Sequence, residues 1–286
     1  MIKKLFSTER SWRLRSLIAL TLLTLAISYL AIGSVNAQAL MWTAVSNPSG
    51  LTDVPAGVAV APSGVYVVGY DMVGGNARWR IERRSPATGA LLAAVAINPS
   101  GGTDVANGVA VDATGVYIVG YDRVPGNERW RIEKRTLLGL APIWVAVSNP
   151  SVGSDMAFDV AVGPTGVYVV GYDRVLGNAR WRIERRSPIN GALLAAPVVS
   201  NPSGGDDMAY GVALDGTGIY VVGFDAVGGD HRWRIEKRAL ANLAPLWVAT
   251  SDPSGLTDRA NDVAVGPSGV YVVGYDMVGG NARWRI

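Results

Sequence analysis

The 286-residue chain contains no cysteine and only one histidine, His231. Without cysteine there are no disulfides, no thiolate metal sites and no cysteine nucleophile. A single histidine also argues against a histidine-based catalytic triad or a histidine-rich metal centre. His231 stands in one repeat of five, so we expect it to be a surface substitution. Stability has to come from packing, and the chain is long enough to bury a core.

The first 39 residues differ in composition from the rest of the chain. Residues 1–16 carry five Lys or Arg against one Glu, residues 17–32 are mostly apolar, and small residues follow up to Ala37 or Ala39. This order is typical of a secretory signal peptide. The alternative is an uncleaved N-terminal membrane anchor, because the apolar run approaches the roughly 20 residues that span a bilayer. Both interpretations predict that residues 40–286 are secreted or extracytoplasmic, in the periplasm or at the cell surface.

The basic character of the chain belongs to this N-terminal segment. The formal net charge is +3, but residues 40–286 hold 21 of the 26 Lys and Arg and 22 of the 23 Asp and Glu. Their net charge is therefore about −1, so they lack the excess of positive charge that indicates nucleic-acid binding. We expect no nucleic-acid partner, and contact with a membrane only through an uncleaved N-terminal segment.

Residues 40–286 are built from five similar units. The stretch Pro62–Ile81 returns letter for letter as Pro267–Ile286, and three looser copies lie between them. The tryptophan of the Arg-Trp-Arg-Ile motif recurs at spacings of 51, 51, 52 and 51 residues, as Trp79, Trp130, Trp181, Trp233 and Trp284. A fixed period of this size indicates an array or a closed ring of supersecondary units.

Each unit reads as four short strands. In the second copy these are Leu91–Ile97, Asn107–Asp112, Gly115–Tyr121 and Glu128–Lys134, which are rich in β-branched and aromatic residues and separated by Gly, Pro, Asn and Asp. Four antiparallel strands in about 50 residues form a propeller blade. The sequence therefore predicts an all-β protein, with a five-bladed β-propeller over residues 40–286 and blades of about 51 residues.

The second unit also resembles a known repeat. Gly108–Tyr121 combines a Val-Ala-Val-Asp strand, a Gly turn and a Val-Tyr-Ile-Val strand. This stretch resembles the bacterial β-propeller repeat family abbreviated SBBP, and more loosely the NHL repeat. The resemblance covers all five units and implies the propeller fold, but it implies little about activity.

The number of strands predicts how the ring closes. Leu40–Ser46 resembles the outermost strand of a unit, and Asn281–Ile286 resembles the third strand of a unit. If Leu40–Ser46 pairs with Asn281–Ile286, five complete blades close without an exposed edge. The units alternate, however: Ser-Pro follows the third strand in the first and third, but not in the second and fourth. An even ring preserves that alternation, so a chain shortened from a larger propeller is the alternative.

The repeated Trp and charged residues have structural explanations. Strand alternation places Trp79 and Ile81 on one face of the blade, with Arg80 and Glu82 on the other. We expect the Trp column to pack between blades, and Asp71, Arg80, Glu82 and their counterparts to form ion pairs between blades. Because every copy has nearly the same surroundings, none is marked as catalytic, and only His231 with Asp230 departs from the pattern. The prediction is therefore no catalytic, metal or cofactor site.

Two polar loops of each unit are expected on one face of the propeller. In the second unit they are Asn98–Asp104, which enters the blade, and Tyr121–Glu128, which joins its second and third strands. This face is the candidate binding surface, because loops carry function on rigid scaffolds. Their Asp and Asn side chains are of a type that binds Ca²⁺, but the spacing of a known calcium loop is missing, and turn chemistry explains them.

These observations favour an exported, non-enzymatic propeller, a monomer that acts as a scaffold or recognition module for a protein or a surface glycan. The first alternative is a lectin with five equivalent sites, which requires partly exposed aromatic rings in pockets between blades. The second is a hydrolase or lyase with a site in the central channel, which requires one blade with unique polar residues.

Overall fold

The structure, a computed structural model, describes residues 41–286, so the predicted signal peptide or anchor at residues 1–39 lies outside the described part of the chain. Residues 44–286 form one unit, and the description that follows concerns this unit. Its secondary structure consists of β-strands joined by turns and loops. No segment of the described chain forms a helix long and apolar enough to cross a bilayer.

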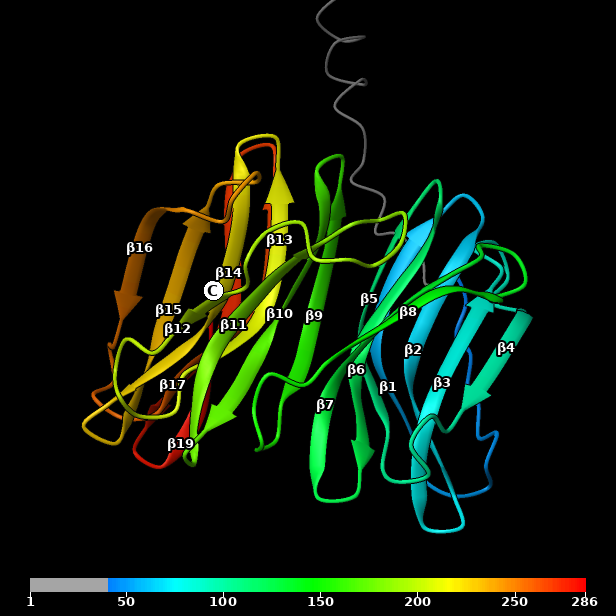
Figure 1. Ribbon diagram of the computed structural model, residues 1–286, viewed down its shortest axis with the longest axis horizontal. Coiled ribbons are helices and arrows are strands. Elements are labelled where there is room, and N and C mark those ends of the chain that lie inside the picture. The colour runs from blue at the N-terminus through cyan, green and yellow to red at the C-terminus, as the bar shows by residue number, and fades with distance from the viewer. Residues whose placement is uncertain (1–40) are drawn as a thin grey trace, which may run out of the picture. The chain divides into compact units, whose positions relative to one another are not determined.

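The strands pair into five antiparallel sheets, each of which follows the chain from its innermost strand outwards (Figure 1). The sheets are blade 1, β1 (Asp53–Ala61), β2 (Gly64–Val73), β3 (Asn76–Arg84) and β4 (Leu91–Ile97); blade 2, β5 (Val105–Asp112), β6 (Gly115–Val124), β7 (Asn127–Arg135) and β8 (Pro142–Ser148); blade 3, β9 (Met156–Gly163), β10 (Gly166–Val175), β11 (Asn178–Arg186) and β12 (Val198–Ser200); blade 4, β13 (Met208–Asp215), β14 (Gly218–Val227), β15 (Asp230–Arg238) and β16 (Pro245–Ser251); and blade 5, β17 (Asp258–Gly266), β18 (Gly269–Val278) and β19 (Asn281–Arg285).

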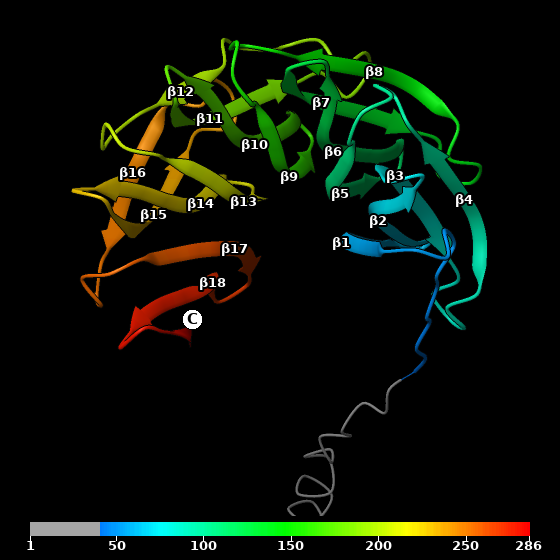
Figure 2. The same cartoon turned by 90° about the horizontal axis from the view of Figure 1, so that it is seen from below.

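The sheets are arranged as propeller blades around a common axis. Each innermost strand packs against the innermost strand of the next blade: β1 against β5, β5 against β9, β9 against β13 and β13 against β17. Figure 2, which looks along the axis, shows the five sheets radiating outwards in this order, with the arc open between blades 1 and 5. The predicted all-β propeller with four strands to a blade is confirmed for blades 1 to 4.

The predicted closing strand is not confirmed in the described part of the chain. Residues 41–47 contain no strand, and β19 pairs only with β18 among the described strands, so blade 5 has three strands. Trp284 on β19 is 95% exposed as a result. The prediction assumed a closed ring, whereas the arc places β1 and β19 at opposite ends (Figure 2).

The repeated tryptophans hold neighbouring blades together, as the sequence predicts. Trp79 is completely buried, and its Nε1 donates a hydrogen bond of 3.0 Å to the carbonyl oxygen of Tyr121 in the next blade. The guanidinium of Arg131, also in the next blade, lies 5.9 Å from the centre of the Trp79 ring. Trp130, Trp181 and Trp233 repeat both contacts in blades 2, 3 and 4. Each indole thus contributes apolar area, a hydrogen-bond donor and a π face to the contact between its blade and the next. We call this contact the joint between the two blades.

The repeated charges form ion pairs inside each blade, which corrects the prediction of pairs between blades. Asp71 of β2 faces Arg78 of β3 across the hairpin, and Arg78 Nε donates to Asp71 Oδ1 over 2.6 Å. Further along β3, Arg80 and Arg84 bind the two oxygens of Glu82 at 2.9 and 2.6 Å. Alternate residues of one strand share a face, so the register places these groups within reach without a second blade.

These buried charges depend on one another. The carboxylates of Asp71, Asp122, Asp173 and Asp225 are buried, and each accepts a hydrogen bond from the arginine that faces it on the neighbouring strand. A carboxylate without its partner in such a place costs several kcal/mol, whereas the complete pair fixes geometry more than it adds stability. The ion pairs therefore set the register of each β-hairpin, and the tryptophans join the blades.

We predict that Trp181→Ala lowers the free energy of unfolding by about 3–5 kcal/mol, because it opens a cavity between blades 3 and 4 and leaves the Phe224 carbonyl without its donor. Trp181→Phe, which retains most of the ring volume, should have a smaller effect. Urea unfolding followed by circular dichroism measures both changes. Trp284→Ala, assayed at low protein concentration, is the control and should change stability by less than about 0.5 kcal/mol. A Trp181→Ala variant as stable as the parent would contradict the packing role.

Candidate functional site

The innermost strand of every blade contains a β-bulge near its start. In blade 3 the pairing of β9 with β10 skips Phe158, so this residue is additional to the ladder. The equivalent bulged residues are Ala56, Asn107, Tyr210 and Asn261. A bulge breaks the regular alternation and changes the direction of a side chain, and bulges are common beside binding sites.

The bulges converge on a pocket of about 370 Å³ at the axis, lined by the innermost strands of all five blades. Two positions whose side chains differ between blades lie here. The bulge position holds Ala56, Asn107, Phe158, Tyr210 and Asn261, and the next position holds Gly57, Gly108, Asp159, Gly211 and Asp262. All but Gly211 line the pocket, whereas the Trp and ion-pair positions hold the same residues in blades 1 to 4.

Aromatic side chains line one side of this pocket. Phe158 stacks on Tyr210 of the next blade, with ring centres 4.8 Å apart and planes at 25°. Arg259 of blade 5 lies 4.6 Å from the centre of the Tyr210 ring. Tyr172 packs behind Phe158, and Phe224 behind Tyr210. Only blades 3 and 4 supply such rings at the bulge, so the pocket has one aromatic wall.

Two carboxylates from blades 3 and 5 lie in the same pocket. Asp159 Oδ1 accepts the backbone N–H of Val160, and its Oδ2 accepts that of Val212 in blade 4, both at 2.8 Å. Asp262 Oδ1 accepts the N–H of Val263 at 2.7 Å, and no described residue donates to its Oδ2. Asp159 therefore joins two blades, whereas Asp262 keeps a free acceptor.

Amide side chains complete the polar part of the pocket. Asn107 Nδ2 donates to the carbonyl oxygen of Ala157 at 2.8 Å, and Asn261 Oδ1 accepts from Arg259 Nε at 2.7 Å. In each amide the other polar atom has no hydrogen-bond partner among the described residues. The pocket thus combines ring surface with acceptors and a donor that can fix the orientation of a ligand, which is the usual make-up of a binding site.

Burial raises the pKa of Asp159 to about 7. The negative charge of Asp262 acts in the same direction, and the two backbone N–H donors act against it. A carboxyl group with a strongly raised pKa inside a pocket is typical of functional sites, although buried structural carboxylates have it as well. Both Asp159 oxygens already accept backbone hydrogen bonds, so its main contact is structural.

We predict that Asp159 makes stability depend on pH. Its folded-state pKa lies above the ordinary value of 3.8, so the folded protein binds more protons between pH 4 and pH 7 than the unfolded chain does. Stability is therefore lost as the pH rises through this window, by no more than about 4 kcal/mol. Asp159→Gly, which installs the residue of blades 1, 2 and 4, should remove this loss. Urea unfolding of both proteins from pH 4.5 to 8 measures it, and parallel curves would contradict the prediction.

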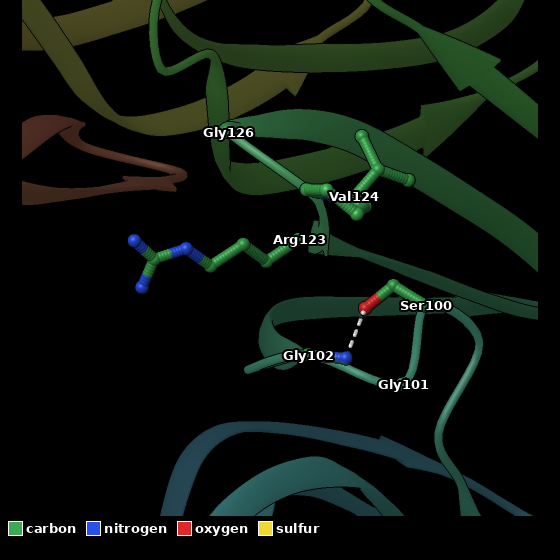
Figure 3. A pocket seen from close by; sticks show the side chains of 7 residues that line it. Ser100, Gly101, Gly102, Arg123, Val124 and Gly126 are labelled. Carbon is green, nitrogen blue, oxygen red and sulfur yellow. Dashed lines mark hydrogen bonds between the residues drawn. The ribbon is translucent and has the colours of Figure 1, made fainter.

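The two polar loops lie side by side, as the sequence predicts. Ser100, Gly101 and Gly102 of one loop and the turn 123–126 of the other enclose a second, open pocket of about 270 Å³ (Figure 3). Ser100 Oγ accepts the N–H of Gly102, and the Arg123 side chain extends from the opposite wall (Figure 3). The register of β5, β6 and β7 puts both loops at the end of the blade where the bulges lie, so the axial pocket and the loop face share this end of the propeller.

The aspartates of the loop face act as loop anchors. Asp104 Oδ1 accepts hydrogen bonds from Ser100 Oγ and from the backbone N–H of Arg123, and its Oδ2 accepts the N–H of Ser100. Asp155, Asp207 and Asp258 repeat this arrangement in the later blades. The turn interpretation accounts for these carboxylates, and in the described part of the chain no three acidic or histidine side chains are grouped to hold a metal ion.

His231 is not the isolated surface substitution that the sequence predicts. Its partly buried ring stacks on Phe224, with centres 4.0 Å apart, and burial lowers its pKa while the charge of Asp230 opposes this. The prediction that only His231 and Asp230 break the repeat is also wrong, because the bulge position holds four residue types in five blades and the position after it is either Gly or Asp. Comparing the five innermost strands with one another would have found this signal.

The repeated tryptophans do not form the exposed platforms that a five-site lectin requires. Trp79, Trp130 and Trp181 are fully buried and Trp233 nearly so, because the next blade covers each ring. Partly exposed rings occur instead at the axis, where Phe158 and Tyr210 line a single pocket. The buried tryptophans of blades 1 to 4 therefore do not provide equivalent ligand sites, whereas the axial pocket has partly exposed aromatic rings.

No family model and no curated protein sequence matches the chain, so the resemblance to the SBBP repeat stays a prediction. Similar solved structures include BamB from Moraxella catarrhalis (TM-score 0.46, 15% identity, covering 81% of this chain and 62% of that one). They also include a GH32 β-fructofuranosidase from Bombyx mori (0.46, 12%, 79% and 55%) and a quinohemoprotein alcohol dehydrogenase from Pseudomonas putida HK5 (0.45, 11%, 80% and 47%). The chain thus spans less than two thirds of the length of each.

Proposed function

We propose that this protein is an exported, non-enzymatic recognition module that binds a protein or a surface glycan through the axial pocket and the surrounding loop face. The blades act as the rigid scaffold, and the pocket supplies the specificity. The proposal concerns one ligand site for the whole propeller and not one for each blade.

One observation carries this proposal: the positions that hold the fold together are the same in blades 1 to 4, whereas the bulge positions of the innermost strands differ between blades and meet at the axis. Trp79, Asp71 and their counterparts have packing and register roles in blades 1 to 4. Asn107, Phe158 and Tyr210 occupy equivalent positions but present an amide, a phenyl and a phenol to one pocket. Sequence variation that packing does not require is expected where a ligand is contacted.

The pocket chemistry suits a ligand with both apolar surface and hydroxyl or amide groups. The partly exposed rings of Phe158 and Tyr210 offer apolar area and aromatic edges. The free oxygen of Asp262 accepts hydrogen bonds, and the free amide atoms of Asn107 and Asn261 add an acceptor and a donor. Sugars and the side chains of a protein loop both have this mixture of groups.

We predict that Tyr210→Asn weakens ligand binding at least about tenfold, which corresponds to about 1.4 kcal/mol. Asparagine occupies the same position in blades 2 and 5, so the fold should tolerate it. The probes are an array of purified bacterial surface glycans and a panel of purified cell-envelope proteins, with affinities measured by biolayer interferometry. Ile189→Ala, an exposed change at the opposite end of blade 3, is the matched control. Equal binding by Tyr210→Asn and the parent would remove the pocket from the contact surface.

A central-channel hydrolase or lyase is the second candidate function, favoured by one observation. The raised pKa of Asp159, about 7, lets this carboxyl group carry a proton in part of the molecules at neutral pH, and a second carboxyl group, that of Asp262, lies in the same pocket. A panel of chromogenic glycosides tests it, with Asp262→Asn as the variant. Turnover that Asp262→Asn abolishes would favour the enzyme, and absence of turnover across the panel would favour the recognition module.

Export is tested separately. We predict that pulse-labelled protein shortens by about 4 kDa, the mass of some 37–39 residues, and appears outside the cytoplasm. Gel mobility after a pulse-chase, together with cell fractionation, measures both properties. A full-length product at the membrane would indicate an uncleaved anchor, and a full-length product in the cytoplasm would contradict export.

A further inference from the structure

The four joints between blades share one set of apolar residues. In blade 1, Tyr66, Val68, Trp79 and Ile81 form a face that is almost completely buried against blade 2. The same types of residue on blades 2, 3 and 4 are packed in the same way against the blade that follows each of them. We call this set of residues (Tyr66, Val68, Trp79 and Ile81 in blade 1) the projecting face of a blade. It takes part in every joint between blades.

Blade 5 presents the same projecting face to solvent. Its residues Tyr271, Val273, Trp284 and Ile286 belong to the stretch that is identical to blade 1, yet Trp284 is 95% and Ile286 83% exposed. In blade 1 the equivalent Trp79 and Ile81 are 0% exposed. Because the sequences are the same, the difference reflects what covers each face: β4 and blade 2 flank it in blade 1, whereas no described strand does so in blade 5.

Blade 1 has the complementary surface uncovered. Val58 and Val60 on β1 are 64% and 68% exposed, whereas Val109, at the position of Val58 in blade 2, is 8% exposed because blade 1 covers it. Val160, Val212 and Val263 are buried in the same way in the later blades. Blade 1 thus has the receiving half of a joint, and blade 5 has the projecting half.

The polar groups of the two free ends match as well. The carbonyl oxygen of Tyr121 accepts from Trp79 in the preceding blade, so the carbonyl oxygen of Tyr70 is the equivalent acceptor for Trp284. Arg131 lies over the ring of Trp79, so Arg80 of blade 1 is the equivalent cation for the Trp284 ring. All these matches follow from the order of the repeats.

A fourth match involves the axial strands. Asp159 Oδ2 accepts the N–H of Val212 in the following blade. Asp262 is in the position of Asp159 and has a free Oδ2, and Val58 is in the position of Val212. A blade 1 placed after blade 5 would therefore supply the donor that Asp262 lacks.

The free ends are held apart by contacts at both edges of each internal joint. At the axis, a Cβ on Gly108 would come within 2.9 Å of Asp159 Cα, so the innermost strands are already at their closest approach. At the outside, Tyr66 Oη donates to the carbonyl oxygen of Leu137 at 2.9 Å, and Arg83 to that of Leu138 at 2.8 Å. Closing the ring within one chain widens the angle between blades and breaks such outer contacts.

We propose that the projecting face of blade 5 binds the receiving face of blade 1 in a second copy of this chain. The contact is head-to-tail, so it uses two different surfaces and can build closed rings or longer assemblies. Blade 5 has no fourth strand, so this joint lacks the outer contacts and is weaker than an internal one. Association is therefore reversible and depends on concentration, in contrast to the monomer expected from the sequence.

The test uses analytical ultracentrifugation of the purified protein with two single variants, Trp284→Ala and Val58→Glu. Both side chains are exposed in the isolated chain, so each variant should keep the circular dichroism spectrum and the melting temperature of the parent in dilute solution. The parent should sediment as integer multiples of the single-chain mass as concentration rises. Each variant alone should remain monomeric, and Ile189→Ala, the control, should behave as the parent does.

Mixing the two variants distinguishes a head-to-tail contact from a symmetric one. Trp284→Ala retains a receiving face and Val58→Glu retains a projecting face, so an equimolar mixture should form a one-to-one dimer and nothing larger. A monomeric parent over the whole concentration range would overturn the proposal. Self-association of Val58→Glu alone would overturn it too, because it would mean that two β19 edges pair with each other. Dimers of the mixture are the result that only the head-to-tail contact gives.

Discussion

The hydrogen bond from each indole to the carbonyl oxygen of the following blade is the interaction on which the rest of the structure depends. A blade of three or four strands cannot bury both of its faces alone, so its stability comes from its neighbours. Trp130 Nε1 reaches the Tyr172 carbonyl at 2.9 Å, and Arg182 of the same neighbour lies over the ring. This contact fixes how far one blade is displaced along the next, which pure apolar packing would leave free.

The ion pairs inside the blades support this arrangement by fixing the hairpin that carries the indole. Arg131 binds both Asp122 and Glu133, and it also covers the Trp79 ring of the preceding blade. One guanidinium thus connects the register of its own hairpin with the joint to its neighbour. A change at this arginine would therefore affect two blades, which explains why the motif is repeated with so little variation.

Much of the fold could be predicted from the sequence, because periodicity and strand alternation report directly on blades. The strand Leu91–Ile97 was expected with the bounds that β4 has. The alternation of the units was visible too, but its cause was not. Gly191, with a φ of 74°, lies under the Trp144 ring of the preceding blade, and the equivalent Leu140 is instead buried at a φ of 57°. Such contacts between a loop of one blade and a strand of another leave no local pattern in the sequence.

The candidate site was harder to predict than the fold. Its residues lie about 50 positions apart, and each looks unremarkable in its own strand. Only the closure of the strands around an axis brings Asn107, Phe158 and Asp262 to one pocket. The open arc was missed for a related reason. The number of strands in the sequence shows which strands can pair, but it contains no information on the angle between neighbouring blades.

The serine–aspartate anchor of the entry loops separates the tip of each loop from the blade beneath it. Asp155 holds the base through Ser151 and Arg174, while Val152 at the tip is almost fully exposed. The tip can therefore change in sequence or length at little cost to folding, as Val152 illustrates in the place where the other four loops have glycine. The same anchored frame recurs in four entry loops and can display inserted peptides at four radially spaced points, which makes the propeller a natural support for multivalent presentation.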